Sequence, residues 1–432
     1  MNIKAWMLNE TKYKYSFSDV AGVAEEPKKG VRKLGPYSKN KFHNTKIGIC
    51  ILCPDEHKQV GQKFYKCIQN GLLYYKPFHT TYKINNCYYA PMQTFQGVDG
   101  GAYRRASLDL IQHIDSTKAD IWLCYVVIEN SFKDIPATQN PYYISKAILL
   151  SNQILVQSIT VEKAKQSDSD LQWILDSISL QSYVKIGGTP WTVESLDSVP
   201  EIIMGIGEAR LSQESKEHIF GYATVFNQNG AYLWTGFGKP ALGFDEYIAN
   251  LQKRIVDSID EYTRVEKVPP KRLIIHLYKP SGRRTEVAAI ENGIAQTNSQ
   301  IEFAILHVDH NTDFRIFDDV MPDLKPYGKV AVYIDELQRL IVLSGREIKW
   351  IPPRVARLHL SPLSTYRDLN SLTQQAYNFT KIHWAGFQPN NVPVTLRYPS
   401  QLAQKYGNLE KLEGDWYKLI TSSFLFDKIW FI

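Results

Sequence analysis

The stretch PEIIMGIGEAR, residues 200–210, decides how the second half of the chain is interpreted. The apolar run 202–204 follows Pro200 and predicts a buried strand. The strand then reaches Gly205 and Gly207, where many α/β folds carry a phosphate-binding loop or a catalytic acid. The stretch has neither a complete Gly-x-Gly-x-x-Gly motif nor an aspartate. A strand that delivers a glycine to this position needs an explanation from the rest of the chain.

A strand meander followed by alternating helices and strands surrounds this stretch. The predicted strands 201–207, 218–226 and 231–237 follow one another, and the turn Asn-Gln-Asn-Gly at 227–230 predicts a hairpin between the last two. The elements predicted next are helix 244–262, strand 272–278, helix 285–296 and strand 302–308. This order is that of a ribonuclease H-like fold.

The first half of the chain alternates strands and helices from the start. The predicted strands are 46–54, 119–130 and 154–160. The predicted helices are 57–75, 104–116, 140–153 and 169–188. Asn140 is the expected N-cap of its helix, and Pro141 is the expected first helical residue. The alternation indicates a parallel, Rossmann-like α/β sheet, and the segments 187–191 and 197–200 mark the boundary to the second half.

Composition narrows the class of protein. A chain of 432 residues with 44% hydrophobic and 22% charged residues is typical of a soluble protein of two or three domains. It has no apolar run long enough for a membrane span, and its first residues are too polar for a secretory signal, so we expect an intracellular, cytoplasmic protein. The net charge of +6 is compatible with a polyanionic partner. Cys50 and Cys53 lie inside an apolar run without a second pair, which indicates buried free thiols.

Nine segments, taken in order, resemble the prokaryotic Argonaute family, specifically its short members made only of MID and PIWI domains. The segments are KLGPY (33–37), YYISK (142–146), VQ (156–157), YVKIGGTPW (183–191), IIMGIGEAR (202–210), LIIHLY (273–278), EFAILHV (302–308), WAGFQPNNVPVTLRYPSQLA (384–403) and WFI (430–432). The resemblance implies an α/β protein with three parts. Residues 1–37 would be an N-terminal arm packing on PIWI, 38–188 a Rossmann-like MID domain, and 189–432 a ribonuclease H-like PIWI domain.

The resemblance also implies a pocket for the 5′ phosphate of a short guide strand. The matching residues are Tyr142, Lys146, Gln157 and Lys185. Tyr142 and Lys146 are four residues apart, so they share one face near the start of a helix, where free N–H groups favour a phosphate. The lysines would supply charge, the glutamine a neutral hydrogen bond, and the tyrosine a ring for the first base. Gln153 remains an alternative to Gln157, and Tyr143 an alternative to Tyr142.

In many members of the family the C-terminal carboxylate helps hold a divalent cation that bridges the guide phosphates. Here that carboxylate belongs to Ile432, and Gln157 would be a further oxygen ligand. Mg²⁺ prefers such oxygen ligands. We therefore expect a Mg²⁺ ion that assists binding and takes no part in catalysis.

The carboxylates with which slicing Argonautes hold two metal ions are replaced here. Gly207, Tyr278 and Ser400 stand at the matching positions. Glu208 is adjacent to Gly207, but neighbouring residues of a strand point to opposite faces. The resemblance thus implies a PIWI domain without nuclease activity.

The sequence gives weaker indications of function for the remaining charged residues. His307, Asp309 and His310 resemble metal ligands, but we expect a structural or solvent-facing role, and Asp318, Asp319 and Asp323 are expected in a solvated loop. Candidate contacts to a nucleic-acid backbone are arginines, which neutralise phosphates without reading sequence. They are Arg210, Arg283, Arg284, Arg354, Arg357 and Arg397.

The resemblance implies a recognition subunit of a prokaryotic defence system. The guide is expected to be a small 5′-phosphorylated RNA (or DNA), and the target complementary single-stranded DNA. An APAZ-containing partner, bearing a sirtuin-like or TIR NADase or a nuclease, would form a heterodimer with the chain and act when the target pairs, with oligomerisation on target binding as a further expectation. The alternatives are a stand-alone guide-dependent DNA-binding protein and a PIWI nuclease with an unconventional metal site.

Overall fold

The computed structural model describes most of the chain. The described residues are 3–15, 26–210, 219–237, 241, 243–278, 284–297, 300–309, 330–334, 339–343, 355–390 and 392–432. The chain divides into two compact units, which we treat separately. The parallel-sheet unit comprises Lys14–Trp191, Trp384–Phe387 and Lys405–Ile432. The nine-stranded unit comprises Met1–Tyr13, Thr192–His383 and Gln388–Gln404.

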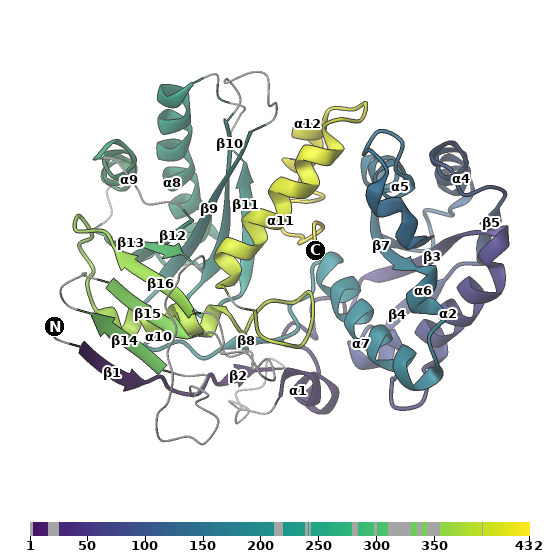
Figure 1. Ribbon diagram of the computed structural model, residues 1–432, viewed down its shortest axis with the longest axis horizontal. Coiled ribbons are helices and arrows are strands. Elements are labelled where there is room, and N and C mark those ends of the chain that lie inside the picture. The colour runs from purple at the N-terminus through teal and green to yellow at the C-terminus, as the bar shows by residue number, and fades with distance from the viewer. Residues whose placement is uncertain are drawn as a thin grey trace. The chain divides into compact units, whose positions relative to one another are not determined.

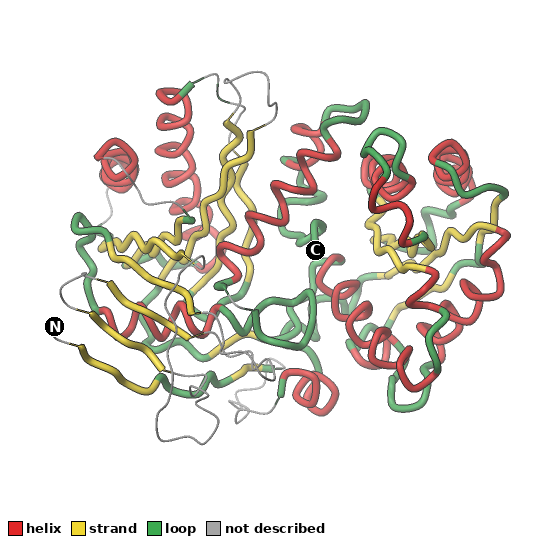
Figure 2. Tube along the Cα trace, viewed as in Figure 1, coloured by secondary structure: helices red, strands yellow, loops and turns green. Residues whose placement is uncertain are grey.

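A five-stranded parallel sheet forms the centre of the parallel-sheet unit (Figures 1 and 2). Strand β3 (Lys46–Pro54) pairs with β6 (Ile121–Ile128), and β6 pairs with β7 (Ile154–Thr160). On its other side β3 pairs with β4 (Asn86–Tyr89) and β5 (Gln93–Phe95). The central strands are buried along nearly their whole length, as expected when helices cover both faces of a parallel sheet.

Helices cover the two faces of this sheet. On one face, Cys124 and Val126 share a core cluster with Tyr103 of α4 (Gly100–His113) and Leu149 of α5 (Pro141–Ser151). On the other face, the Tyr125 ring meets Phe64 of α2 (Lys58–Asn70) at 5.3 Å between ring centroids, and its hydroxyl lies 2.9 Å from Ser182 of α7 (Asp168–Lys185). The remaining short helices are α1 (Pro27–Leu34), η1 (Asp55–His57), α3 (Phe78–Thr81), η2 (Asn130–Asp134), α6 (Val161–Ala164) and α12 (Trp416–Ile420). This three-layer arrangement is Rossmann-like, as predicted.

Local sequence signals account for the start of helix α5, which carries two of the predicted site residues. The Asn140 side chain accepts a hydrogen bond from the Tyr142 N–H at 2.9 Å, and Pro141 occupies the first turn, so the predicted start of α5 is confirmed. Cys50 and Cys53 are buried free thiols in β3, also as predicted.

The nine-stranded unit is built around residues 201–210, which form a strand within the stretch PEIIMGIGEAR. Its sheet has the order β1-β14-β15-β16-β13-β12-β9-β10-β11. Strand β9 (Glu201–Arg210) pairs antiparallel with β10 (Ile219–Asn227) and parallel with β12 (Arg272–Leu277), which pairs parallel with β13 (Glu302–Asp309). With β11 (Tyr232–Phe237), these strands form the expected ribonuclease H-like core.

Antiparallel strands extend the sheet beyond β13. They are β16 (Val355–Leu360), β15 (Arg339–Leu343), β14 (Val330–Ile334) and β1 (Ile3–Met7). The helices of the unit are α8 (Phe244–Glu266), α9 (Arg284–Gln296), α10 (Leu369–Phe379) and most of α11 (Val394–Leu409). The short strands β2 (Tyr13–Lys14) and β8 (Thr192–Val193) complete the assignment.

The predicted hairpin between β10 and β11 is present, and its turn shows why. The Asn227 side chain accepts hydrogen bonds from the N–H groups of Asn229 and Ala231. Gly230 has φ 72°, a conformation that glycine adopts readily.

The two largest differences between the unit boundaries and the predicted domain limits lie in the first and last parts of the chain. The predicted arm 1–37 is divided: β1 pairs with β14, whereas α1 belongs to the parallel-sheet unit, where Lys28 and Arg32 form ion pairs with the buried Asp176. Residues 405–432 also belong to the parallel-sheet unit, not with the rest of the predicted 189–432 segment. Contacts with residues distant in the sequence determine which unit each of these two segments joins, and local sequence patterns do not encode such contacts.

Within the described residues, no helix combines the length and the apolar character needed to cross a membrane.

Candidate anion-binding site

Four side chains singled out by the sequence lie close together in the parallel-sheet unit. Tyr142 and Lys146 come from α5, Gln157 from β7 and Lys185 from the last turn of α7. The two lysines and the glutamine are buried. The parallel sheet explains the convergence, because β7 follows directly after α5 and α7 returns to pack on β7. We call these residues, with Lys405, the lysine pocket.

Lys146 is held by neutral oxygen atoms. Its ammonium donates to the Trp430 carbonyl at 3.0 Å and to the Tyr142 hydroxyl at 3.3 Å. Burial, with the nearby charges of Lys185 and Lys405, lowers the pKa of Lys146 to about 7, and its contact with Tyr142 only partly opposes this. The ammonium is therefore a buried cation that an anion would stabilise.

Lys185 is likewise held by neutral oxygen atoms. Its ammonium donates to the Val156 carbonyl at 3.0 Å and to Gln157 Oε1 at 2.7 Å. Burial and the charge of Lys405 lower the pKa of Lys185 to about 7. Both lysines thus lack a carboxylate among these hydrogen-bond partners.

Lys405, on α11, is a pocket residue that the sequence analysis missed. Its ammonium lies 4.5 Å from the centroid of the Tyr142 ring and 5.7 Å from that of Tyr143. Burial alone would raise the pKa of Tyr142, but Lys146 and Lys405 overcome this and lower it to about 8. No spacing signal links Lys405 to the other pocket residues, although it lies only two residues after the quoted block 384–403.

The structure also separates the two alternatives left open by the sequence. Gln153 is exposed in the turn between α5 and β7, with φ 60°, whereas Gln157 contacts Lys185. The Tyr143 hydroxyl accepts a hydrogen bond from Asn408 at 3.0 Å, while Tyr142 contacts Lys146. Gln157 and Tyr142 are therefore the members of these pairs that form hydrogen bonds with Lys185 and Lys146.

The residues offered for Mg²⁺ fit an ion only if a ligand supplies most of its oxygen atoms. Gln157 Oε1 already accepts a hydrogen bond from Lys185, which competes with a metal for that oxygen. In the described part of the chain, no three His, Cys, Asp or Glu side chains are grouped as metal ligands. The Ile432 carboxylate follows the buried Trp430 and Phe431 and is the one anionic oxygen donor in this proposed set.

In the nine-stranded unit, two of the positions expected for catalytic acids lie side by side toward the carboxyl ends of adjacent parallel strands. Ile206 of β9 is in register with Leu277 of β12, so Gly207 and Tyr278 come next on two adjacent parallel strands. The Tyr278 side chain is 45% exposed, and Ser400 is exposed on α11. The Glu208 side chain lies outside the described part of the chain.

The two glycines of β9 have different surroundings. A Cβ at Gly205 would meet the Thr395 carbonyl oxygen of α11 at 1.6 Å, so the close approach of this helix requires glycine. His276, in register with Gly205, forms a 2.6 Å hydrogen bond between its Nδ1 and the Thr395 hydroxyl. Burial lowers the pKa of His276 to about 4, so its ring is neutral at pH 7. Packing therefore explains Gly205, whereas Gly207 stands at the position that the resemblance assigns to a catalytic acid.

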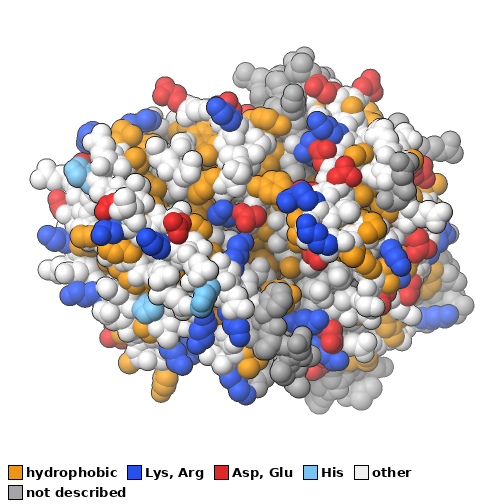
Figure 3. Space-filling model, turned by 180° about the vertical axis from the view of Figure 1, so that it is seen from behind, with side chains coloured by type: hydrophobic (Ala, Val, Ile, Leu, Met, Phe, Trp, Pro, Cys, Tyr) orange, Lys and Arg blue, Asp and Glu red, His pale blue; other side chains and the backbone are white. Residues whose placement is uncertain are grey.

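The other candidate residues do not form a second cluster in the described structure. His307 is buried and its ring lies 6.1 Å from that of His359, while Asp309 pairs with Arg357 at 2.6 Å. Arg397 is exposed. Outside the described structure are His310, Asp318, Asp319, Asp323, Arg283 and Arg354, and the side chains of Arg210 and Arg284. On the face drawn in Figure 3, Lys and Arg side chains are interspersed with Asp and Glu.

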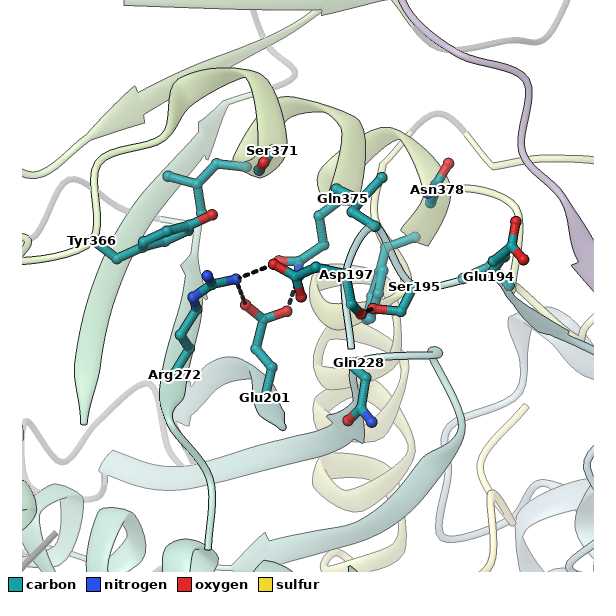
Figure 4. Close-up of a pocket in the computed structure, with 14 residues that line it drawn as sticks. Glu194, Ser195, Asp197, Glu201, Gln228, Arg272, Tyr366, Ser371, Gln375 and Asn378 are labelled. Carbon is teal, nitrogen blue, oxygen red and sulfur yellow. Dashed lines mark hydrogen bonds and ion pairs between the residues drawn. The ribbon is translucent and has the colours of Figure 1, made fainter. Parts of the chain in front are cut away.

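A polar cavity lies at the opposite end of β9 from Gly207 (Figure 4). Arg272 pairs with Asp197 at 2.7 Å and approaches Glu201 at 3.8 Å, and Gln375 donates a hydrogen bond to Glu201. Burial raises the pKa of Glu201 to about 7, although Arg272 opposes this. Because Glu201 and Arg272 are the first residues of β9 and β12, this network joins the beginnings of the two central strands.

Comparisons with known proteins agree with this architecture. Residues 132–336 match the Piwi domain family. The chain is 24% identical over 425 residues to protein argonaute of Cereibacter sphaeroides, covering 90% of this chain and 54% of that protein. It is 22% identical over 324 residues to the Piwi protein of Archaeoglobus fulgidus, covering 70% of this chain and 74% of that protein.

Solved structures of the same fold include three with long matches. Clostridium butyricum Argonaute bound to a guide DNA and a 19-mer target DNA gives a TM-score of 0.75 at 17% identity, covering 94% of this chain and 53% of that one. Drosophila Piwi gives 0.73 at 14% identity, covering 99% and 56%. Marinitoga piezophila Argonaute in complex with a 5′-OH guide RNA gives 0.66 at 14% identity, covering 93% and 58%.

The chain spans about half the length of the C. sphaeroides protein and of these three solved chains. Its own ribonuclease H-like sheet agrees with the Piwi domain match over residues 132–336. The chain is similar to Argonaute and Piwi proteins along most of its length.

Proposed function

We propose that the lysine pocket binds the 5′-phosphate end of a short guide strand, which the protein uses to recognise complementary nucleic acid. One observation carries this proposal: Lys146 and Lys185 are buried ammonium groups whose hydrogen-bond partners are neutral oxygens. A buried charge without a counter-ion is costly, and a phosphate dianion would supply the missing charge. Lys405 adds a third cation beside Tyr142.

The pocket chemistry favours a phosphomonoester at the end of a strand over an internal phosphate. A terminal phosphate carries up to two negative charges, whereas an internal diester carries one, so it matches several converging cations better. The Tyr142 ring, beside Lys405, would offer a stacking surface to the first base.

The relatives bear on the choice of guide and target. The C. butyricum structure contains a guide DNA and a target DNA, and the M. piezophila structure contains a guide RNA. We propose a 5′-phosphorylated RNA guide and a single-stranded DNA target for this chain, with base pairing as the source of specificity. A Mg²⁺ ion held by the Ile432 carboxylate and the guide phosphates would add to phosphate binding.

We further propose that the protein recognises its target without cutting it. Gly207, Tyr278 and Ser400 supply no carboxylate for a two-metal site. In this proposal an APAZ-containing partner, an NADase or a nuclease, supplies the chemistry in a prokaryotic defence system.

The pocket is tested by fluorescence anisotropy with guides that carry a 5′ phosphate or a 5′ hydroxyl. Lys146→Met and Lys185→Met should each weaken binding of the phosphorylated guide by about tenfold or more, because each removes a charge-assisted contact. Binding of the hydroxyl guide should change little. Lys118→Met, an exposed lysine of the same unit, is the matched control. Unchanged preference for the phosphate in both pocket variants would refute the assignment.

Two further experiments address the remaining parts of the proposal. A guided cleavage assay with Mg²⁺ or Mn²⁺ should give no product, and cleavage that is lost in Glu208→Ala would instead establish an unconventional nuclease. Co-purification with the product of a neighbouring gene should yield a stable heterodimer, whereas a stand-alone DNA-binding protein would purify without it.

A further inference from the structure

The polar cavity at the start of β9 and β12 contains a buried oxygen atom without a partner among the described residues (Figure 4). This atom is Oε1 of Gln375, a residue of α10 that lines the cavity and is 9% exposed. The Nε2 atom of the same amide donates a hydrogen bond to Glu201. Turning the amide over would place its oxygen against the ionised Glu201 carboxylate, which is also an acceptor. Oε1 therefore needs a donor or a cation from outside these residues.

The buried carboxylate of Glu201 has no close cation in the described structure. Arg272 donates a hydrogen bond to Asp197 at 2.7 Å, whereas its distance to Glu201 is 3.8 Å. Its Nε also lies 3.8 Å from the exposed carboxylate of Glu302, so one guanidinium faces three carboxylates. Glu201 is 5% exposed, and water therefore screens its charge poorly. When Glu201 is ionised, one negative charge in the cavity is left without compensation.

The size and the lining of the cavity limit what can supply that charge. Its volume of about 20 Å³ is enough for about one particle of the size of water, which excludes an organic ligand. The third carboxylate that lines it, that of Glu194, already pairs with Lys12 at 3.0 Å. Mg²⁺ and Zn²⁺ sites normally have further ligands or waters, and Arg272 opposes a double positive charge here. One monovalent cation fits both the space and the missing charge.

A proton competes with such a cation for Glu201. Burial raises the pKa of Glu201 to about 7, although Arg272 opposes this. The other charged or titratable groups around it are Asp197 in the preceding loop, Tyr262 of α8 and Tyr366 before α10. Burial raises the pKa of both tyrosines, so they stay neutral near pH 7. Below pH 7 the proton neutralises Glu201, and above pH 7 a cation can take its place.

We propose that this cavity binds one monovalent cation, Na⁺ or K⁺, between oxygens of Glu201, Asp197 and Gln375, in exchange for the proton of Glu201. The bound cation stabilises the starts of the two central strands at the pH at which the proton is lost. The site lies within the nine-stranded unit, and the proposal does not depend on guide binding.

Thermal unfolding of the full chain in different chloride salts tests the proposal. The probes are NaCl, KCl and tetramethylammonium chloride at equal ionic strength, because tetramethylammonium is too large for the cavity. At pH 8.5 the midpoint should be about 3 °C or more higher in NaCl or KCl than in tetramethylammonium chloride. At pH 5.5 the salts should give equal midpoints, because Glu201 then carries its proton.

Substitutions assign the effect to the cavity. Glu201→Gln removes the charge and keeps the size of the side chain, so the difference between salts at pH 8.5 should disappear. Glu302→Gln is the matched control, because it removes an exposed carboxylate beside the same Arg272 and should keep the full difference. Gln375→Met removes the unpartnered oxygen and should reduce the difference. It serves as the test if Glu201→Gln does not fold, and the comparison of pH values in the wild type needs no variant.

Three results would overturn the proposal. Equal midpoints in all salts at pH 8.5 would show that the cavity holds no cation. A difference that persists in Glu201→Gln or at pH 5.5 would show a general salt effect on the protein. In crystals soaked in RbCl at pH 8.5, an anomalous peak beside Glu201 and Gln375 is expected, whereas the density of a water alone would contradict the site.

Discussion

Lys146 donates a hydrogen bond to the backbone carbonyl of Trp430 at 3.0 Å, although 284 residues separate the two along the chain. The same ammonium lies 5.5 Å from the centroid of the Trp430 ring. The end of the chain therefore forms part of the wall of the lysine pocket. Because Trp430 and Phe431 are buried, this wall depends on core packing as well as on the hydrogen bond.

Guide binding should depend on pH because of these buried lysines. Lys146 and Lys185 have pKa values lowered to about 7, and a bound anion favours their charged forms. Binding then takes up protons, so phosphate-dependent affinity should fall about tenfold or more from pH 7 to pH 9. The phosphate is already mainly a dianion over this range, so its own titration does not cause the fall. Anisotropy titrations at constant ionic strength would measure this, with the 5′-hydroxyl guide as the control. A flat profile over this range would contradict the prediction.

Lys405→Met should have two effects that differ in sign. It removes one cation near the phosphate, so affinity at pH 7 should fall about tenfold. It also removes a positive charge that lowers the pKa of Lys146 and Lys185, so the decline with pH should move to higher pH. The same titrations would show both effects. A loss of affinity with no movement of the pH profile would mean that Lys405 does not act on these lysines.

Gly205→Ala should destabilise the nine-stranded unit. The added Cβ would overlap the Thr395 carbonyl oxygen, so β9 and α11 would have to separate, at a cost of about 3 kcal/mol or more in unfolding free energy. Gly236→Ala in β11 is a matched control, because its nearest described neighbour would be an Arg254 side-chain carbon at 3.6 Å. Thermal or urea unfolding would measure the difference. Equal stability of the two variants would show that the helix does not press on β9.

Glu201 should make stability fall as pH rises. Its folded pKa of about 7 lies above the ordinary value of 4.5, so the folded state binds its proton more tightly than the unfolded state. This contribution is fully present below pH 4.5 and is lost as the pH rises through 7. Relative to wild type, Glu201→Gln should therefore gain up to about 3 kcal/mol of unfolding free energy between pH 4.5 and pH 7.5. Urea unfolding of both proteins at several pH values would measure this, and parallel pH profiles would contradict it.

Local sequence patterns determined most of the secondary structure, because periodicity, caps and turns act over a few residues. The Asn140 cap, the Asn227–Gly230 turn and the apolar strands all appear where the sequence predicts them. The resemblance of the ordered motifs also identified four residues that lie close together in the structure. Three of them come from α5 and β7, which are adjacent along the chain.

Only the tertiary structure showed which distant residues complete the site. Lys405 and the Trp430 carbonyl reach the pocket because α11 and the terminal segment pack in the parallel-sheet unit, and no periodicity encodes such a contact. The same holds for the two glycines of β9: the sequence marks both as unusual in a strand, but only the approach of Thr395 shows that Gly205 is required by packing. Long-range packing and the burial of charge depend on the whole fold, so the lowered pKa values of the lysines could not be obtained from the sequence alone.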